Sequence, residues 1–180
     1  IDDLVFSHVH HQNYSLGQQL VCPLPNELNT PVAATLGMAL VAMTGIQTVR
    51  PELGDDVVVT GAGLVGQFAA QLAALSGAYP ILIDIVDERL QVARSCGINT
   101  TINPIREDAS ERVMELTNGK GANIILECTG VPDVATSAID YARRSGRFVF
   151  VGSPRGEFQT DITPFLEKVH LWKPGGNLTL

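Results

Sequence analysis

The stretch Val57-Val58-Val59-Thr60-Gly61-Ala62-Gly63-Leu64-Val65-Gly66 decides the fold, because four β-branched residues lead directly into a G-x-G-x-x-G turn. The β-branched run predicts a short buried strand. In such a turn the first glycine lets the chain reverse, the second lets a pyrophosphate approach, and the third lets the next helix lie close to the strand. The start of that helix would present free N–H groups and a positive dipole end. The pattern predicts a pyrophosphate site formed by Gly61, Gly63, Leu64, Val65 and Gly66.

A second apolar run, Pro80-Ile81-Leu82-Ile83, ends in Asp84, 23 positions after Gly61. A carboxylate at the carboxyl end of a strand can accept hydrogen bonds from an adenosine ribose, and it repels a 2′-phosphate, which favours NAD over NADP. Asp84 could also cap the helix that begins near Val86. Arg89 keeps NADP open as the less favoured cofactor, since an arginine near that ribose can receive a 2′-phosphate.

Composition narrows the class of protein. The chain has 180 residues, 45% of them hydrophobic and 17% charged, which predicts a globular domain of ordinary size with an appendage. A net charge of −7 without a basic block argues against nucleic acid and anionic membranes as partners. No apolar run is long enough to span a bilayer and no secretory signal is visible, so we expect a cytoplasmic protein. Cys22, Cys96 and Cys128 predict reduced thiols rather than disulfides or a structural zinc site.

Strand and helix signals alternate after Pro51 and predict an α/β fold, a doubly wound parallel sheet of about six strands covered on both faces. The expected strands are 57–60, 80–84, 100–103, 123–129, 147–152 and 177–180, and the expected helices are 64–76, 87–95, 107–117, 131–143 and 163–171. Gly77 and Gly146 are expected to end helices, and Pro132 to lie in a first turn. A stripe at helical spacing predicts the apolar face of the first of these helices; it consists of Leu64, Val65, Phe68, Leu72 and Leu75.

The segment before Pro51 is organised differently. Residues 1–30 contain two β-like stretches, Leu4–Phe6 and Gln19–Cys22, which are too few to bury a core of their own. From Val32 to Val49 the chain is apolar almost all round, which predicts a buried helix.

Several blocks resemble the medium-chain dehydrogenase/reductases, the zinc-type alcohol dehydrogenase superfamily. They are 53–66, 84–97, Ile125-Leu126-Glu127-Cys128-Thr129-Gly130 and Gly146-Arg147-Phe148-Val149-Phe150-Val151-Gly152. The resemblance implies that residues 31–180 are a Rossmann domain that binds NAD. It also implies that residues 1–30 are the closing strands, a remnant, of a GroES-like catalytic domain.

Two strand ends supply further candidate residues, because open α/β sheets bind ligands at the carboxyl ends of their strands. By resemblance, Cys128, Thr129 and Gly130 border the cofactor ribose, and Val151, Gly152 and Ser153 border the nicotinamide. Arg89 resembles a lid on the adenine. Ordinary strand-end turns are the alternative interpretation for both trios. Cys128 has no assigned base nearby, so we do not expect a nucleophile.

The sequence assigns no catalytic residue and no metal ligand. Relatives with catalytic zinc usually place a Cys or Glu ligand about 17 residues before the Gly54-Asp55 pair, but this chain has Gly37 there, which makes zinc doubtful. His8, His10 and His11 lack a further ligand at a recognisable spacing, so we expect solvent-facing histidines.

These observations predict an oxidoreductase, similar to alcohol and polyol dehydrogenases, that passes a hydride between a nicotinamide cofactor and a small alcohol or carbonyl. The parent enzyme is expected to be a homodimer or tetramer. Two alternatives share the strand, the glycine turn and the terminal acid: a regulatory NAD-binding module without catalysis, and an S-adenosylmethionine-dependent methyltransferase.

Overall fold

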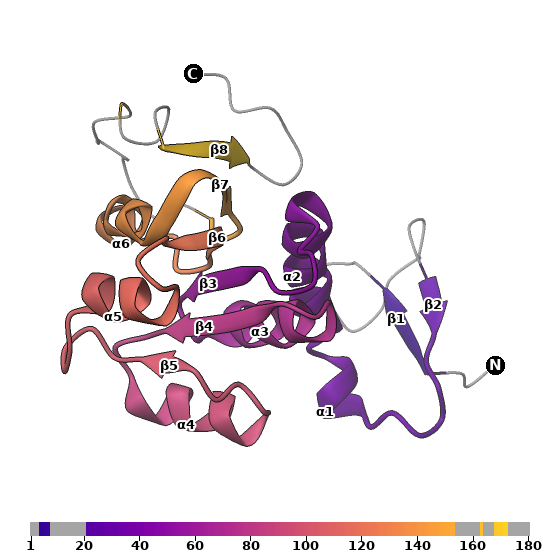
Figure 1. The fold of residues 1–180 in the computed structure, drawn as a ribbon. Coiled ribbons are helices and arrows are strands. Elements are labelled where there is room, and N and C mark those ends of the chain that lie inside the picture. Colours follow the sequence, from indigo (N-terminus) through magenta and orange to yellow (C-terminus); the bar gives the residue numbers. More distant parts are fainter. Residues whose placement is uncertain (1–3, 8–20, 154–162, 164–167, 173–180) are drawn as a thin grey trace.

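A six-stranded parallel sheet forms the centre of the molecule in the computed structural model, which describes residues 4–7, 21–153, 163 and 168–172. The strand order is β5-β4-β3-β6-β7-β8 and every neighbouring pair is parallel. The strands are β3 (Asp56–Thr60), β4 (Tyr79–Ile83), β5 (Thr101–Ile102), β6 (Ala122–Glu127), β7 (Ala142–Phe150) and β8 (Val169–Trp172). The order reverses between β3 and β6, so the predicted doubly wound fold is confirmed (Figure 1).

Helices cover both faces of this sheet. The helices α2 (Leu36–Val49), α3 (Leu64–Leu75) and α4 (Asp87–Ser95) share one core cluster, to which β3 contributes Val57 and Val59. The helices α5 (Ala109–Leu116) and α6 (Pro132–Ala138) share the other cluster with Val58. Alternate residues of β3 therefore face opposite layers, and burial on both faces explains why this strand is a continuous apolar run.

The first crossover helix, α3, contacts the sheet through small residues. Ala69, Ala70 and Ala73 are fully buried, which lets the helix axis approach the strands closely. The predicted stripe is wrong at both of its ends, because Leu64 and Leu75 are exposed. Gly77 follows the last turn with a φ of +84°, as predicted for a glycine that ends a helix.

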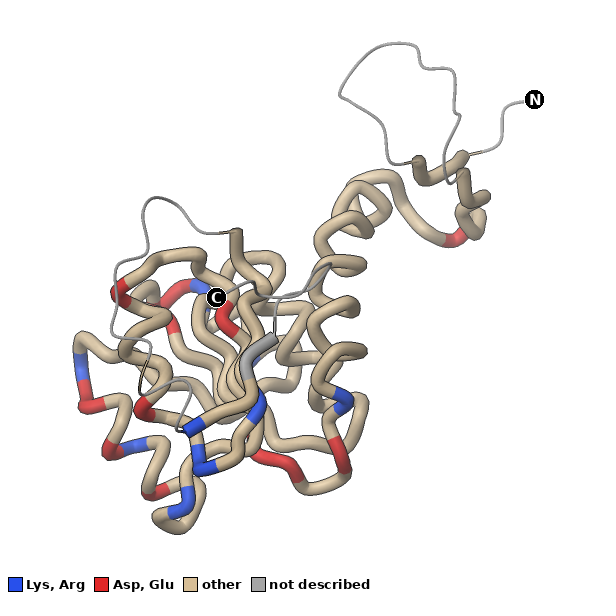
Figure 2. Tube along the Cα trace, turned by 90° about the horizontal axis from the view of Figure 1, so that it is seen from above, with Lys and Arg blue, Asp and Glu red and all other residues tan. Residues whose placement is uncertain are grey.

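The expected buried helix near residues 32–49 is two helices, α1 (Thr30–Ala33) and α2, and α2 is buried on one side only. Ala42, Ile46 and Val49 face the sheet, whereas Met38, Leu40 and Val41 are exposed. The prediction failed because the sequence shows that all faces of this helix are apolar, but it does not show which faces another part of the protein covers. No charged residue interrupts α2, which runs from the sheet toward the start of the chain (Figure 2).

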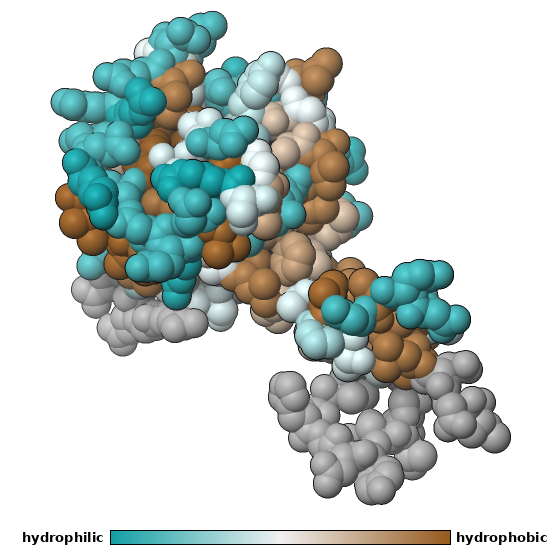
Figure 3. Space-filling model, turned by 90° about the horizontal axis from the view of Figure 1, so that it is seen from below, coloured by the Kyte–Doolittle hydropathy of each residue, from teal (hydrophilic) through white to brown (hydrophobic). Residues whose placement is uncertain are grey.

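The two β-like stretches near the start form an antiparallel pair, β1 (Val5–Ser7) and β2 (Val21–Pro23), as the sequence indicates. This pair and α1 form a small lobe away from the sheet, and Figure 3 shows hydrophobic surface on it. In the part of the chain that the structure describes, no helix combines the length and the apolar character that crossing a membrane requires.

The second half of the sheet departs from the expected boundaries. The helix that begins at Pro132 ends at Ala138, a 3-10 turn (Ile139–Tyr141) follows, and β7 starts at Ala142, five residues earlier than expected. Gly146 therefore lies inside a strand instead of ending a helix. A Cβ on this residue would lie 3.0 Å from the Arg143 carbonyl oxygen, so the backbone packs closely here. Residues 169–171, expected in a helix, belong to β8, while the strand expected at 177–180 lies outside the described residues.

Candidate functional site

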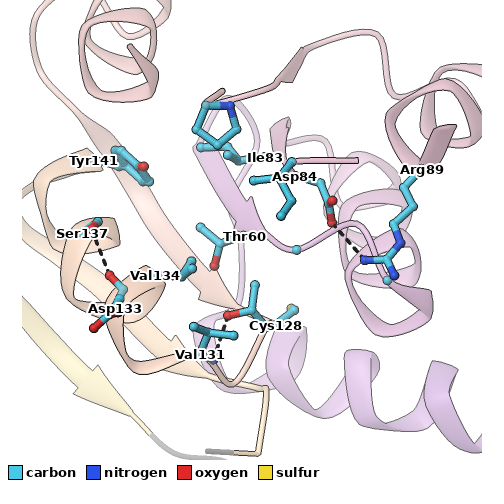
Figure 4. A pocket seen from close by; sticks show the side chains of 15 residues that line it. Thr60, Ile83, Asp84, Arg89, Cys128, Val131, Asp133, Val134, Ser137 and Tyr141 are labelled. Atoms are coloured by element: carbon cyan, nitrogen blue, oxygen red, sulfur yellow. Dashed lines mark hydrogen bonds and ion pairs between the residues drawn. The ribbon is translucent and has the colours of Figure 1, made fainter. Parts of the chain in front are cut away.

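A pocket of about 580 Å³ opens at the carboxyl ends of β3, β4 and β6, where the strand order reverses. Six of the predicted site residues line it: Gly61, Gly63, Asp84, Arg89, Cys128 and Thr129. Asp84 and Arg89 form one side, and Asp133, Ser137 and Tyr141 the other (Figure 4). The remaining predicted residues lie around the pocket without lining it: Leu64, Val65, Gly66, Gly130, Val151, Gly152 and Ser153.

The three glycines of the turn meet different surroundings. Gly61 has a φ of +89°, and a Cβ there would lie 2.7 Å from the Thr129 methyl. A Cβ on Gly66 would lie 1.7 Å from the Gly61 carbonyl oxygen, so any side chain would push α3 away from the strand. A Cβ on Gly63 would meet nothing within 4 Å. The protein itself therefore requires Gly61 and Gly66, whereas Gly63 borders open space in the pocket.

The start of α3 is available to an anion. Its N-cap is Gly63 in extended conformation, and no side chain caps the first turn, in which Leu64 and Val65 lie. The first N–H groups of a helix have no partner within the helix, and together they carry partial positive charge. Because Gly63 also lines the pocket, a phosphate there would meet this helix end.

Asp84 is 8% exposed and joins two turns. Its Oδ2 accepts from the Ala62 amide at 2.6 Å and its Oδ1 from the Val86 amide at 2.8 Å. A carboxylate offers about four acceptor positions, so positions remain for ligand hydroxyls. The cap of α4 is Val86, without a side-chain hydrogen bond, so Asp84 is not the N-cap of that helix. Arg89 reaches Oδ2 at 3.6 Å from an exposed position, where an ion pair contributes little.

Sequence reasoning missed Gln67, which holds the same turn from its other side. Its Nε2 donates to the Ala62 carbonyl at 3.3 Å and to the Arg89 carbonyl at 2.8 Å. The two peptide groups on either side of the Ala62 Cα are thus both held, the first through the Ala62 N–H by Asp84 and the second through the Ala62 oxygen by Gln67. Nothing in the sequence pattern separates this buried glutamine from an ordinary helix residue.

The loops after β6 and β7 pack against each other at glycines. Gly130 has a φ of +66°, and a Cβ on it would lie 2.1 Å from the Ser153 carbonyl oxygen. A Cβ on Gly152 would lie 2.5 Å from the Gly130 nitrogen. Val151–Ser153 therefore lies behind the Cys128–Gly130 loop as seen from the pocket, which explains why only Cys128 and Thr129 reach it.

Cys128 lines the pocket, and its surroundings disfavour the thiolate. Burial raises the pKa of this thiol well above its ordinary value, and the negative charge of Glu127 raises the pKa further. Thiolate is the reactive form of cysteine, so a nucleophilic role for Cys128 stays unexpected.

We expect iodoacetamide to alkylate exposed Cys96 at least about tenfold faster than Cys128 in the folded protein at pH 8.5. Peptide mass mapping over time measures both rates. Urea should bring the two rates together, because unfolding removes the burial that raises the pKa of Cys128. Equal rates in the folded protein would contradict this assignment.

Among the described residues, no group of three or more His, Cys, Asp or Glu side chains is placed to hold a metal ion. Gly37 lies in α2 with open space beside its Cα and offers no ligand. His8, His10 and His11 lie outside the described residues. The residues that the structure describes therefore do not fit a catalytic zinc.

Comparisons with known proteins agree with this geometry. The sequence profile of a family described as zinc-binding dehydrogenase matches residues 65–171. An uncharacterised zinc-type alcohol dehydrogenase-like protein of Haemophilus influenzae is 34% identical over 153 residues, covering 82% of this chain and 44% of that protein. A sorbitol dehydrogenase of Halalkalibacterium halodurans is 41% identical over 118 residues, covering 64% of this chain and 34% of that enzyme.

A solved structure of an alcohol dehydrogenase from Thermus sp. ATN1 matches with a TM-score of 0.74 and 28% identity, covering 85% of this chain and 45% of that one. The chain thus spans less than half the length of the relatives it matches. The profile covers more than half of the chain, and the sheet order and glycine turn agree with it. The chain belongs to the zinc-binding dehydrogenase family of the medium-chain dehydrogenase/reductase superfamily.

Proposed function

We propose that this chain is the dinucleotide-binding part of an oxidoreductase that transfers a hydride between a nicotinamide cofactor and a small alcohol or carbonyl. One observation carries the proposal: a single pocket combines the open space at Gly63, the uncapped start of α3 and the buried carboxylate of Asp84. Relatives named sorbitol dehydrogenase and L-threonine 3-dehydrogenase support a substrate with a hydroxyl group.

The described residues fit the adenosine ribose and the pyrophosphate of a dinucleotide. The pyrophosphate would lie over Gly63 and accept hydrogen bonds from the N–H groups of Leu64 and Val65. The ribose hydroxyls would donate to the remaining acceptor positions of Asp84. The cofactor supplies the hydride chemistry when bound, and the protein binds and orients it.

The charge of this site favours NAD over NADP in our proposal. Asp84 would repel a 2′-phosphate, and it is the buried member of its pair with Arg89, which is exposed. Among the described residues, no second arginine or lysine lines the pocket to offset this repulsion.

Replacing Asp84 with serine should weaken NADH binding by about 1–3 kcal/mol, because ribose hydroxyls lose a charged acceptor. The same change should narrow the difference between NADH and NADPH. Isothermal titration calorimetry measures both affinities.

Thermal shifts with NADH, NADPH and S-adenosylmethionine separate a dehydrogenase or NAD-binding module from a methyltransferase.

Asp87→Ser is the matched control, because Asp87 lies three residues further on, pairs with Arg106 and does not line this pocket. Its NADH affinity should stay within about twofold of the wild type. A wild-type protein that prefers NADPH, or an Asp84→Ser variant with unchanged affinity, would contradict the ribose assignment.

We also propose a division of the chain into two parts and a state for the whole enzyme. Residues 1–30 are proposed to be a catalytic-domain remnant and residues 31–180 the cofactor domain. The catalytic acid–base stays unassigned. A homodimer or tetramer in the cytoplasm is the proposed state of the whole enzyme.

A further inference from the structure

Glu127, the last residue of β6, is a carboxylate with no exposed surface. A buried charge is destabilising unless donors satisfy it. Its Oε1 accepts from the Thr129 amide at 2.7 Å, from the Thr129 hydroxyl and, weakly, from the Thr60 hydroxyl at 3.5 Å. Its Oε2 accepts from the Gly130 amide at 3.1 Å. The carboxylate thus binds the loop that directly follows its own strand.

The backbone of the same residue holds a second loop. The Glu127 carbonyl oxygen accepts from the amides of Val151 and Gly152, both at 2.8 Å. Next to it, the Cys128 amide donates to the Thr60 carbonyl at 2.9 Å. Glu127 therefore lies where the segments after β3, β6 and β7 meet.

The Cys128–Gly130 loop forms a wall of the pocket, although Glu127 itself does not line it. Thr129 packs against the glycine turn so closely that a Cβ on Gly61 would lie 2.7 Å from its methyl group. Any outward movement of this loop would change the distance between the loop and the turn that faces the phosphates.

We propose that Glu127 is a positioning residue for the dinucleotide. Its buried carboxylate fixes the Cys128–Gly130 loop against Gly61 before the ligand arrives, so binding does not have to order the loop. A preformed site binds more tightly because less conformational entropy is lost on association. The inference rests on the proposed function for the identity of the ligand.

Glu127→Gln tests the role at nearly constant size. An amide has one acceptor oxygen, and its NH₂ group would face the N–H of either Thr129 or Gly130. We expect a folded protein with an NADH dissociation constant at least about tenfold higher. We also expect hydrogen–deuterium exchange over residues 128–131 to be at least about tenfold faster without any cofactor.

Ile125→Val is the control for a loss of stability alone, because Ile125 is fully buried in the same strand but belongs to a core cluster that includes neither Glu127 nor the Cys128–Gly130 loop. It should lower the melting temperature and leave both NADH affinity and loop exchange within about twofold of the wild type. If Glu127→Gln does not fold, Thr129→Val replaces it, since this variant removes one donor to the carboxylate. Without cofactor, it should speed hydrogen–deuterium exchange over residues 128–131 more than Thr129→Ser, which keeps the hydroxyl.

Unchanged NADH affinity in Glu127→Gln would overturn the positioning role, even if loop exchange became faster. Weaker binding in Ile125→Val by the same factor would also overturn it, because the effect would then follow stability. A wild type that binds neither NADH nor NADPH would overturn the proposed function and with it the identity of the ligand. In that case, hydrogen–deuterium exchange over residues 128–131 still compares Glu127→Gln with the wild type, because it is measured without cofactor. Faster exchange in the variant supports the anchoring of the loop by Glu127, and equal exchange overturns it.

Discussion

Replacing Gly66 with alanine or valine is expected to destabilise the fold by about 4 kcal/mol or more, a size reserved for severe core disruption. The reason is geometric: a Cβ at this position would lie 1.7 Å from the Gly61 carbonyl oxygen, which belongs to backbone and cannot rotate away. The first turn of α3 would have to leave β3, and with it the buried face formed by Ala69, Ala70 and Ala73. Urea unfolding followed by circular dichroism measures the loss.

Gly37→Ala is the matched control for this experiment. Gly37 also lies in a helix, but a Cβ there meets nothing within 4 Å. Alanine inside a helix is favoured over glycine by about 0.5–1 kcal/mol, so this variant should be as stable as the wild type or slightly more stable. A Gly66→Ala protein that unfolds at the same urea concentration as the wild type would refute the close contact between helix and strand.

Replacing Gly63 with valine is expected to weaken NADH binding at least about 100-fold, which corresponds to about 2.8 kcal/mol. A Cβ at this position meets no protein atom within 4 Å, so the added side chain would extend into the space over the turn that a pyrophosphate needs. Stability should change by less than about 1 kcal/mol, since the backbone at Gly63 is in the extended region that any residue adopts. Calorimetric titration and urea unfolding of the same sample separate the two effects.

Together the two glycines distinguish scaffold from ligand site. Gly66→Val should lose stability and binding together, whereas Gly63→Val should lose binding alone. If Gly63→Val still bound NADH and had the same melting temperature as Gly66→Val, the turn would be an ordinary strand–helix connection. The phosphate site would then lie elsewhere.

The sequence was most informative where one short stretch determines its own structure. The glycine turn, the boundaries of α4 and the placement of Pro132 in a first turn follow from local chemistry, and all three agree with the structure. The same holds for the parallel sheet, because alternating β-branched strands and helices leave few other arrangements.

Burial and tertiary hydrogen bonds could not be obtained in this way. Met38 and Leu40 read as core residues but are exposed, because no pattern shows what lies opposite a helix face. Gly146 read as a helix end, yet β7 begins before it since Ala142 pairs with Ala122 of β6. Glu127 and Gln67 were missed because their side chains bind mainly backbone groups, which any residue type carries and which leave no signature in the sequence.

The reversal of strand order between β3 and β6 also has a consequence for how the chain folds. Val57 pairs with Ile124, so the central pair of the sheet closes a loop of 67 residues that contains β4, β5 and three helices. Contacts between such distant residues slow folding, because loop-closure entropy is lost before the pairing stabilises anything. The pocket lies across this same pair, so the surface proposed to bind the cofactor is completed only at the step that joins the two halves of the sheet.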